Sequence, residues 1–325
     1  MNPAVPEPWT RWLASRGAAP ARVEPLPGDV SPRRYARVTA ADGTLAILAV
    51  YPGEVRDVCA RFVATTALLH AAEVRVPSIL AVDCAAGFML VEDLGPRMLA
   101  DLGGCPWDEL APRFADALAQ AARIAALAPA AVAAVNPPLD RALLARELAQ
   151  TWDLFLAPRG LLGTPAESAA LRAVLDELLD RIADDPPRPC HRDFMARNLV
   201  PRDGESDAVA VLDHQDLRLG PPAYDLASLL NDTLFPPPAA EEALLAAAAP
   251  SPADRLRYHR TAAQRTLKAV GTYAAFARRG AERHLPLVPA TLGRCLAHLA
   301  RTPEGEPAAP HLARLWRPAL EPGRN

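Results

Sequence analysis

Most strand patterns of this sequence lie in its first third, and helical patterns fill almost all of the rest. Short alternating or apolar segments between turn residues predict strands at residues 22–26, 34–38, 44–51, 78–83 and 87–91. Asp42-Gly43 is a hairpin signal between the second and third of these. Strands followed by a run of helices are typical of an α+β fold, so we expect an antiparallel sheet in one region and helices in another.

Apolar residues at helical spacing predict the remaining elements. A short helix around residues 9–16 and one main helix at 54–72 accompany the predicted sheet. Further helices are expected at residues 108–128, 140–155, 165–183, 223–231, 241–248, 252–279 and 289–300. We interpret PPPAAEE at 236–242 and the Ala/Pro-rich tail as surface connections or loose ends. The length suits two lobes, a small one at residues 1–94 and a larger, mostly helical one at 95–325.

The composition argues against several classes of protein. Half of the residues are hydrophobic and 22% are charged, as in an ordinary globular chain. A net charge of -3 and a pI near 6.2 provide no basic field for nucleic acid. No apolar stretch reaches membrane-spanning length, and the N-terminus lacks the apolar run of a secretion signal. We therefore expect a cytoplasmic monomer without a nucleic-acid or membrane partner.

The cysteines are scattered along the chain. They form no CxxC pair and no spacing typical of a zinc cluster. We therefore expect reduced, mostly buried thiols at Cys59, Cys84, Cys105, Cys190 and Cys295.

An interruption of the helical region carries the candidate chemistry. The segment CHRDFMARNLV contains His191-Arg192-Asp193 and, five positions after the aspartate, Asn198. A predicted hairpin then ends in Asp213. Phosphoryl transfer needs a carboxylate that orients the attacking hydroxyl and oxygen ligands for magnesium. We interpret Asp193 as the catalytic base, and Asn198 and Asp213, at opposite ends of the hairpin, as metal ligands.

Each part of this pattern has a plainer explanation, because a His-Arg-Asp tripeptide is usually a solvated surface loop. The ordered set seldom arises by chance, since GPPAYDLASLL follows it and places Asp225 at the start of a helix. An aspartate there can cap amides and accept hydrogen bonds from the loop. We expect structural roles for His191 and Asp225; for Asp225 the alternative is a simple charge at a helix N-terminus.

With these motifs the chain resembles the aminoglycoside phosphotransferase and choline kinase family, over most of its length. Within that family it is most similar to the anomeric kinases of N-acetylmuramic acid and N-acetylglucosamine. The segments that carry this likeness are GDVSPRRYARV, FMLVEDLG, VLDHQDLRLGPPAYDLASLLND and AAQRTLKAVGTYAAFARRG. The resemblance implies a bilobal protein-kinase-like fold and an ATP- and Mg²⁺-dependent kinase. It also implies phosphorylation of the C1 hydroxyl of the amino sugar, in peptidoglycan recycling.

The nucleotide side departs from the wider kinase pattern, because the third predicted strand contains no lysine. Arg33 or Arg34 could supply the missing charge, and one of them should face inward because neighbouring strand residues point to opposite sides. The metal and backbone amides could instead neutralise the phosphate charge. Another alternative is that both arginines face solvent. The sequence does not decide whether Glu54 or Asp57 would orient an inward arginine.

Other nucleotide contacts are expected on the backbone. Amides of the turn that contains Gly28 and Ser31 could approach phosphate oxygens, although an ordinary hairpin loop is the alternative. Glu92, Asp93 and Leu94 are expected at the hinge between the lobes, where backbone groups could hold the adenine edge. ATP and GTP are not distinguished.

Candidates for sugar contacts are weaker, and for each a structural or solvent role is the alternative. They are His214, Gln215, Asp216, Arg218 and Glu147. Lys268, the only lysine, is assigned no role, because a helical lysine is usually exposed.

Two other functions stay open. An aminoglycoside or choline-like amino alcohol as acceptor would need an acidic pocket, whereas a muramate carboxylate would need a cation such as Arg218. The absent strand lysine suggests a non-catalytic, nucleotide-binding pseudokinase, against which the intact set of Asp193, Asn198 and Asp213 argues.

Overall fold

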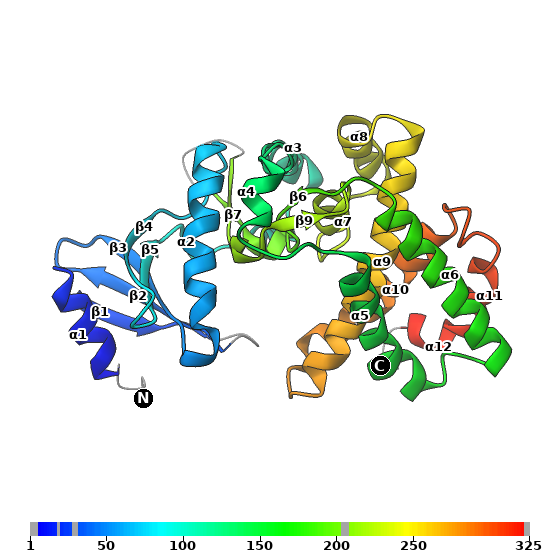
Figure 1. Cartoon of the computed structure of the whole chain (residues 1–325), viewed down its shortest axis with the longest axis horizontal. Helices are drawn as coiled ribbons and strands as arrows, with labels where there is room; N and C mark the ends of the chain where they lie inside the picture. Colours follow the sequence, from blue (N-terminus) through cyan, green and yellow to red (C-terminus); the bar gives the residue numbers. More distant parts are fainter. Residues whose placement is uncertain (1–5, 18–19, 28–31, 203–207, 322–325) are drawn as a thin grey trace.

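The computed structural model describes residues 6–17, 20–27, 32–202 and 208–321. A five-stranded antiparallel sheet in the order β1-β2-β3-β5-β4 lies at one end of the molecule, and most of the remaining chain is helical (Figure 1). The strands are β1 (Pro20–Pro25), β2 (Arg34–Ala40), β3 (Leu45–Val50), β4 (Ile79–Asp83) and β5 (Phe88–Glu92). The predicted α+β fold and the predicted strands are confirmed.

Side-chain alternation along the strands gives the sheet two apolar faces. The helices that pack on it are α1 (Glu7–Ser15) and α2 (Arg56–Ala71). Leu48 of β3 packs with Trp12 of α1, whereas its neighbour Ala49 packs with Phe62 of α2. The sheet is therefore buried on both sides, which holds the strands in a fixed register.

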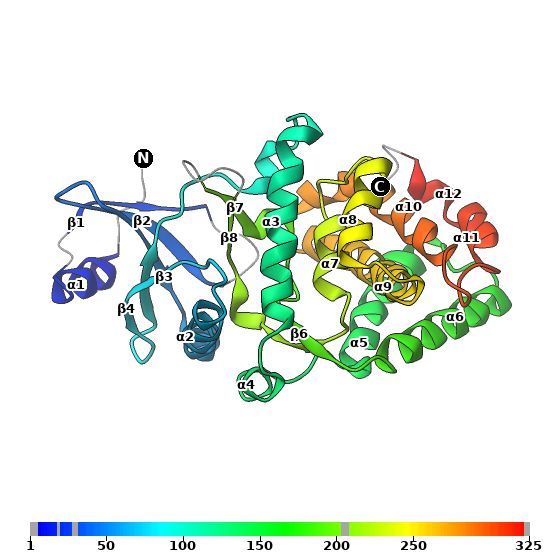
Figure 2. The same cartoon turned by 90° about the horizontal axis from the view of Figure 1, so that it is seen from above.

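The larger part of the molecule is helical, as predicted. Its helices are α3 (Trp107–Ala125), α4 (Pro129–Ala133), α5 (Arg141–Thr151), α6 (Pro165–Ala183), α7 (Tyr224–Leu230), α8 (Pro238–Ala248), α9 (Pro252–Ala277), α10 (Val288–Leu299), α11 (Ala309–Leu315) and α12 (Arg317–Leu320). The long α9 contacts α5, α6, α7 and α10 and so forms the centre of this part (Figure 2). None of the helices formed by the described residues has the length and apolar character that a bilayer crossing requires.

Two small antiparallel pairs interrupt the helices and position the candidate site. β7 (Leu199–Pro201) pairs with β8 (Val209–Val211), and this is the predicted hairpin. β6 (Arg188–Cys190) pairs with β9 (Arg218–Gly220), which the sequence analysis did not predict. Strands of three residues are too short for a period-2 pattern to be recognised.

The C-terminal tail is packed, so the prediction of a loose end was wrong. Leu312 and Trp316 are buried in the same apolar core as α5, α6, α9 and α10. The indole Nε1 of Trp316 donates to the carbonyl of Leu161 at 3.0 Å. Prolines suggested a loose segment, but Pro310 and Pro318 lie in the first turns of α11 and α12, where a missing N–H costs nothing. The prolines of PPPAAEE likewise suggested a surface connection, but the last of them begins α8.

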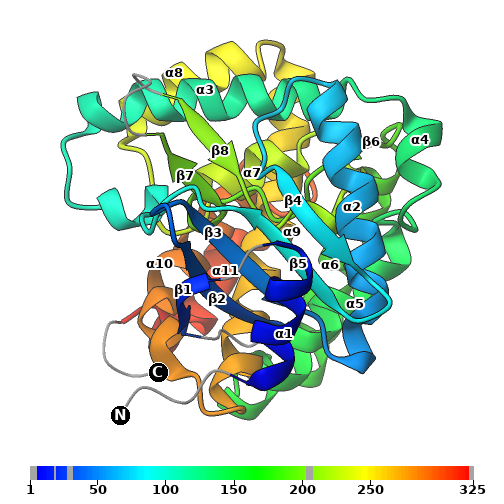
Figure 3. The same cartoon turned by 90° about the vertical axis from the view of Figure 1, so that its left-hand side faces the viewer.

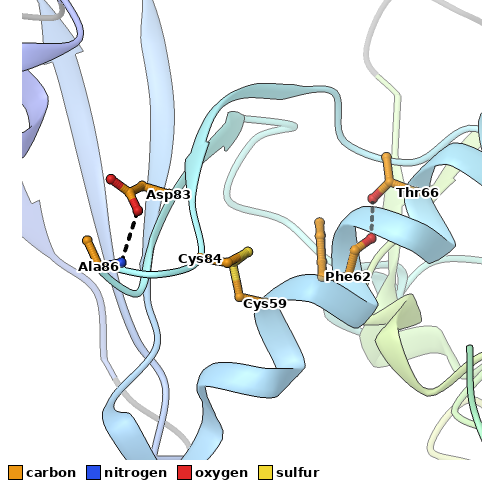
Figure 4. Close-up of a disulfide and its surroundings, with 6 residues drawn as sticks. All are labelled: Cys59, Phe62, Thr66, Asp83, Cys84 and Ala86. Carbon is orange, nitrogen blue, oxygen red and sulfur yellow. Dashed lines mark hydrogen bonds between the residues drawn. A yellow bond between two sulfur atoms is a disulfide. The ribbon is translucent and has the colours of Figure 1, made fainter.

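Cys59 and Cys84 form a disulfide between α2 and the turn after β4 (Figure 4). The prediction of reduced thiols was therefore wrong for this pair. Their Cα atoms lie 5.5 Å apart, although 25 residues separate them in the chain. The packing of α2 on the sheet creates this proximity, so the spacing of the cysteines in the sequence does not predict the disulfide. Cys105, Cys190 and Cys295 are free thiols.

We propose that the lobes divide after Leu94, where the chain leaves the sheet. The two apolar clusters on the sheet faces draw on residues 9–91 only. The end of α2 and the loop after it cross this boundary, because Leu69, Val74 and Val76 join a core cluster of the larger lobe. Viewed along the long axis, the sheet lies in front of the helical lobe (Figure 3).

The crossing of α5 and α9 depends on a glycine. An added Cβ at Gly271 would lie 2.7 Å from both Cα and N of Thr151, and backbone atoms cannot yield as a side chain can. We expect Gly271→Ala to lower the free energy of unfolding by about 2 kcal/mol through overpacking. Gly293→Ala on α10 is the matched control, because nothing lies within 4 Å of its added Cβ. It should stabilise by up to about 1 kcal/mol. Urea unfolding of both variants gives the comparison, and equal effects would contradict the close approach.

Candidate active site

The loop that contains Asp193 is fixed to the start of α7. Both carboxylate oxygens of Asp225 accept from this loop, from the backbone N–H of His191 at 2.7 Å and from that of Arg192 at 3.0 Å. Arg192 has a φ of 77°, a region that a residue with a side chain seldom occupies without such support. Asp225 is buried, and this burial raises its pKa. The geometry supports the structural role proposed for Asp225.

The side chain of His191 ties the same loop to the strand that precedes Asp213. Its ring is fully buried, and Nε2 lies 2.9 Å from the carbonyl oxygen of Leu212. The ring also packs edge-on against Phe194. These contacts support a structural role for His191.

The β7–β8 hairpin brings the two proposed metal ligands together. Asn198 ends the short helix η5 (Ala196–Asn198), and its carbonyl accepts from the N–H of Leu212, the residue before Asp213, at 2.8 Å. Its side-chain Nδ2 donates to the carbonyl of Asp193 at 2.8 Å, which leaves the amide oxygen as the remaining polar atom for a cation. Two protein oxygens with phosphates and waters are a common magnesium set.

Asp213 is paired with an arginine from the other lobe. Arg33 Nη2 lies 2.8 Å from Asp213 Oδ1, and Arg33 Nη1 donates to Gln215 Oε1 at 3.2 Å. Gln215 Nε2 also donates to Asp213 Oδ1 at 3.0 Å, so it positions that carboxylate. The side chain of Arg33 is only 13% exposed, whereas Arg34 is exposed. Of the two arginines, Arg33 is therefore the inward one.

The acidic partner of Arg33 differs from both residues that the sequence suggested. Glu54 and Asp57 are exposed, and Asp57 pairs with Arg61 at 3.0 Å. The partner is Asp213, which only the folding of the two lobes brings near. The other proposed phosphate contacts, Gly28 and Ser31, lie outside the described residues.

At the proposed hinge, the acidic side chains are engaged within the small lobe. Glu92 forms an ion pair with Arg75, and Asp93 forms one with Arg37 at 2.5 Å. The N–H of Glu92 donates to the carbonyl of Ser78 at 2.9 Å. Leu94 lines a cavity of about 210 Å³. These side-chain contacts leave the expectation for the hinge, which concerned backbone groups, as a proposal.

His214 is not placed for sugar contact, contrary to the sequence-based expectation. Its ring is fully buried between η6 (His214–Asp216) and α2. Nδ1 lies 2.9 Å from Thr65 Oγ1, and the ring packs on Phe62. Burial lowers the pKa of His214 to about 3, so the ring is neutral. The sequence placed it beside Asp213, but the short helix turns its side chain toward α2.

Three of the other candidates for sugar contact, Glu147, Asp216 and Arg218, form an ion-pair network around Arg192. Arg192 pairs with Glu147 of α5 at 2.9 Å and also with Asp216. Asp216 in turn pairs with Arg218 at 2.9 Å. Glu147 and Arg218 are 8% and 6% exposed, and Gln215 is 8% exposed. Glu147, Asp216 and Arg218 therefore support the catalytic loop through Arg192, whereas Gln215 supports Asp213.

Comparison with known proteins assigns this constellation to a family. Residues 22–261 match the phosphotransferase enzyme family. The chain belongs to this family. It is therefore a phosphotransferase enzyme, as the sequence motifs implied.

Named relatives and solved structures agree with this assignment. N-acetylmuramate/N-acetylglucosamine kinase from Pseudomonas aeruginosa is 34% identical over 305 residues, which cover 88% of this chain and 86% of that protein. The Pseudomonas putida protein of the same name is 32% identical over 291 residues, 85% of this chain and 83% of its own. An ADP-bound aminoglycoside phosphotransferase has a TM-score of 0.62 at 12% identity, over 92% of this chain and 98% of that one. A choline/ethanolamine kinase family protein from Mesorhizobium loti has a TM-score of 0.58 at 20% identity, over 91% of this chain and 92% of that one. The protein-kinase-like fold is thereby confirmed.

The sequence analysis missed the cations that α9 brings to this phosphotransferase site. Arg265 Nη2 lies 3.6 Å from Asp193 Oδ1, and Lys268 is only 13% exposed rather than solvated. Burial alone would raise the pKa of Asp193, but the charges of Lys268, Arg265 and Arg192 outweigh it and lower that pKa to about 2. The signal in the sequence was the i, i+3 spacing of two cations on one face of an otherwise buried helix.

Proposed function

We propose that this phosphotransferase uses ATP and Mg²⁺ to phosphorylate the anomeric C1 hydroxyl of N-acetylmuramic acid or N-acetylglucosamine, in peptidoglycan recycling. The observation that carries the proposal is that one loop and one hairpin gather Asp193, Asn198 and Asp213, in a chain whose relatives bear that kinase name. Asp193 retains 26% exposure of its side chain, so a hydroxyl can reach it.

The reaction requires little covalent work from the protein. Asp193 is ionised at neutral pH and accepts a hydrogen bond from the C1 hydroxyl, which orients the oxygen for in-line attack on the terminal phosphorus. A bond forms between O1 and this phosphorus as the bond to the bridging oxygen of ADP breaks, and the hydroxyl proton passes to Asp193 and then to solvent. An anomeric hydroxyl is more acidic than an ordinary alcohol, so a carboxylate of low pKa is sufficient.

Asn198 and Asp213 would hold the magnesium ion, and Arg33 would supply the charge that a strand lysine supplies in other kinases. When bound, the metal neutralises charge on the phosphates. Asp213 faces the small lobe through Arg33, so these residues lie on the side from which the nucleotide is expected.

The charges around Asp193 disfavour the other acceptors considered. Arg265 Nη2 lies 3.6 Å from its Oδ1, and the charges of Lys268, Arg265 and Arg192 lower its pKa. Such surroundings repel a polycationic aminoglycoside or a choline-like amino alcohol. The non-catalytic alternative is disfavoured because Asp193, Asn198 and Asp213 are all present, and hydrogen bonds join Asn198 to Asp193 and to Leu212, the residue before Asp213.

An acceptor panel tests the proposal. ADP release should require Mg²⁺ and either N-acetyl sugar, and the product should have lost its reducing end. The matched control is the 1-O-methyl glycoside of N-acetylglucosamine, which keeps every other hydroxyl and should be inactive. Phosphorylation of this glycoside would contradict transfer to C1. Activity with kanamycin or choline, but with neither N-acetyl sugar, would show that the proposed acceptor class is wrong.

The two neighbouring arginines allow a sharp test of the nucleotide side. We expect Arg33→Gln to weaken binding of Mg²⁺–ATP about tenfold, because a charge-assisted contact to phosphate is lost. Arg34→Gln removes the same charge from an exposed position and should change affinity less than about twofold, as surface charges do. Equilibrium binding of the nucleotide distinguishes them, and equal effects would show that Arg33 contributes only to the general field.

A further inference from the structure

The ion-pair network around Arg192 and Asp193 leaves one cation without a close carboxylate. Four cationic side chains share three carboxylates there: Arg192, Arg218, Arg265 and Lys268 with Glu147, Asp193 and Asp216. Each arginine has a carboxylate within hydrogen-bonding distance or close to it. Lys268 shares Glu147 with Arg192, which holds that carboxylate at 2.9 Å. Lys268 is therefore the cation of this network that has no closely held carboxylate of its own.

The ammonium of Lys268 is poorly satisfied for a group with so little exposure. Within the part of the chain that the structure describes, its acidic partner is Glu147 Oε1 at 3.9 Å, beyond hydrogen-bonding distance. Burial lowers the pKa of Lys268, and the charge of Arg265 lowers it further. An ammonium has three donors, so an anionic ligand at this position would relieve both the desolvation and the repulsion.

A second orphaned group lies on the same face of α9. Gln264, one helical turn before Lys268, is fully buried and donates weakly to Glu147 Oε2 at 3.4 Å. Its amide oxygen has no hydrogen-bond partner among the described residues. Unsatisfied buried acceptors are rare, and they mark positions where a water or a ligand group is missing. A cation without a close hydrogen-bond acceptor and an unpaired acceptor, four residues apart on one helix, suit a ligand that carries both an anion and donor groups.

We propose that Lys268 binds the carboxylate of an acidic N-acetylamino sugar, such as the lactyl group of N-acetylmuramic acid. This inference rests on the proposed function for the identity of the sugar. Lys268 would then be a specificity-determining residue, and the acidic sugar would be the preferred acceptor of the two.

None of the other three cations is as well placed for this role, and Arg192 is already held by Glu147 and Asp216. Arg218 is 6% exposed and donates to both the carbonyl and the carboxylate of Asp216. Arg265 donates to Ser228 Oγ at 2.9 Å and faces the carboxylate of Asp193. The carboxylate contact that the sequence suggested for Arg218 therefore moves to Lys268.

Binding without nucleotide provides the test, because it does not depend on turnover. Wild-type protein should bind N-acetylmuramic acid at least about tenfold more tightly than its lactyl methyl ester, which is one methyl group larger but neutral. In Lys268→Met this preference should vanish while affinity for the ester stays within about twofold. Lys268→Arg, which keeps the charge, should retain most of the preference.

A control variant and the remaining outcomes separate the possible failures. Arg255→Met removes a cation from the exposed start of α9, where it pairs with Glu242, and should leave the preference unchanged. A preference that is absent from wild type would overturn the inference, and so would one that survives in Lys268→Met, including the case in which both ligands are weakened equally. If the preference follows Lys268 but neither sugar is phosphorylated at C1, the proposed function fails and the anion site stands.

Discussion

Asp193→Asn is expected to lower turnover about a thousandfold while leaving the fold and the affinity for nucleotide nearly unchanged. The amide keeps the shape of the carboxylate but can no longer accept the hydroxyl proton, and a positioned base contributes about 10²- to 10⁴-fold. The contact from Asn198 Nδ2 goes to the carbonyl of Asp193 and not to its side chain, so the metal ligand keeps its support. The effect should therefore fall on kcat.

Steady-state kinetics with the preferred N-acetyl sugar, together with equilibrium binding of Mg²⁺–ATP, checks this expectation. Asp184→Asn, a matched change at an exposed position at the end of α6, should leave kcat within about twofold. Thermal unfolding of both variants distinguishes loss of chemistry from loss of fold. An Asp193→Asn enzyme with full turnover would remove this residue from the reaction and with it the mechanism proposed above.

The features that the sequence predicted are those in which a local pattern decides the structure. β3 and β5 were recognised because an apolar segment between turn residues leaves few alternatives, and Asp42-Gly43 specified the hairpin. The catalytic loop was recognised because Asp193 and Asn198 lie five residues apart in one loop. Strand alternation led us to expect one inward arginine, and Arg33 is that residue, although it lies just before β2 and not within it.

The features that the sequence analysis missed depend on contacts between distant segments. The Cys59–Cys84 disulfide forms because α2 packs on the sheet. His214 was assigned to the sugar because it follows Asp213, but Thr65 and Thr66 of α2 hold its ring.

Lys268 was also misjudged because its surroundings come from a distant segment, but here the wrong expectation was solvent exposure. A lone lysine on a helix is exposed by default. Nothing within its own helix indicated that α5 would cover it or that Glu147 would face it. The available signal was the i, i+3 spacing of Arg265 and Lys268 on one helix face. It indicates a buried charge only once Glu147 of α5 is known to face that helix.

The second large effect is expected at Asp225, where structure and activity should fail together. Asp225→Ala leaves the backbone N–H groups of His191 and Arg192 without their acceptors, and each buried unsatisfied donor costs about 1–3 kcal/mol. Relief of the buried charge, whose pKa burial has raised, offsets part of this cost. We expect a net loss of about 2–4 kcal/mol in the free energy of unfolding.

Turnover of Asp225→Ala should also fall at least tenfold. The contacts from the N–H groups of His191 and Arg192 to Asp225 hold Arg192 at its φ of 77°, and this conformation orients Asp193. Asp225→Asn, with one oxygen left to accept, should lie between wild type and alanine in both quantities. Urea unfolding and steady-state kinetics on the same preparations give the comparison. Asp193→Asn should lose activity without stability, so the two aspartates are separable. Native stability in Asp225→Ala would show that the loop holds its conformation without the carboxylate.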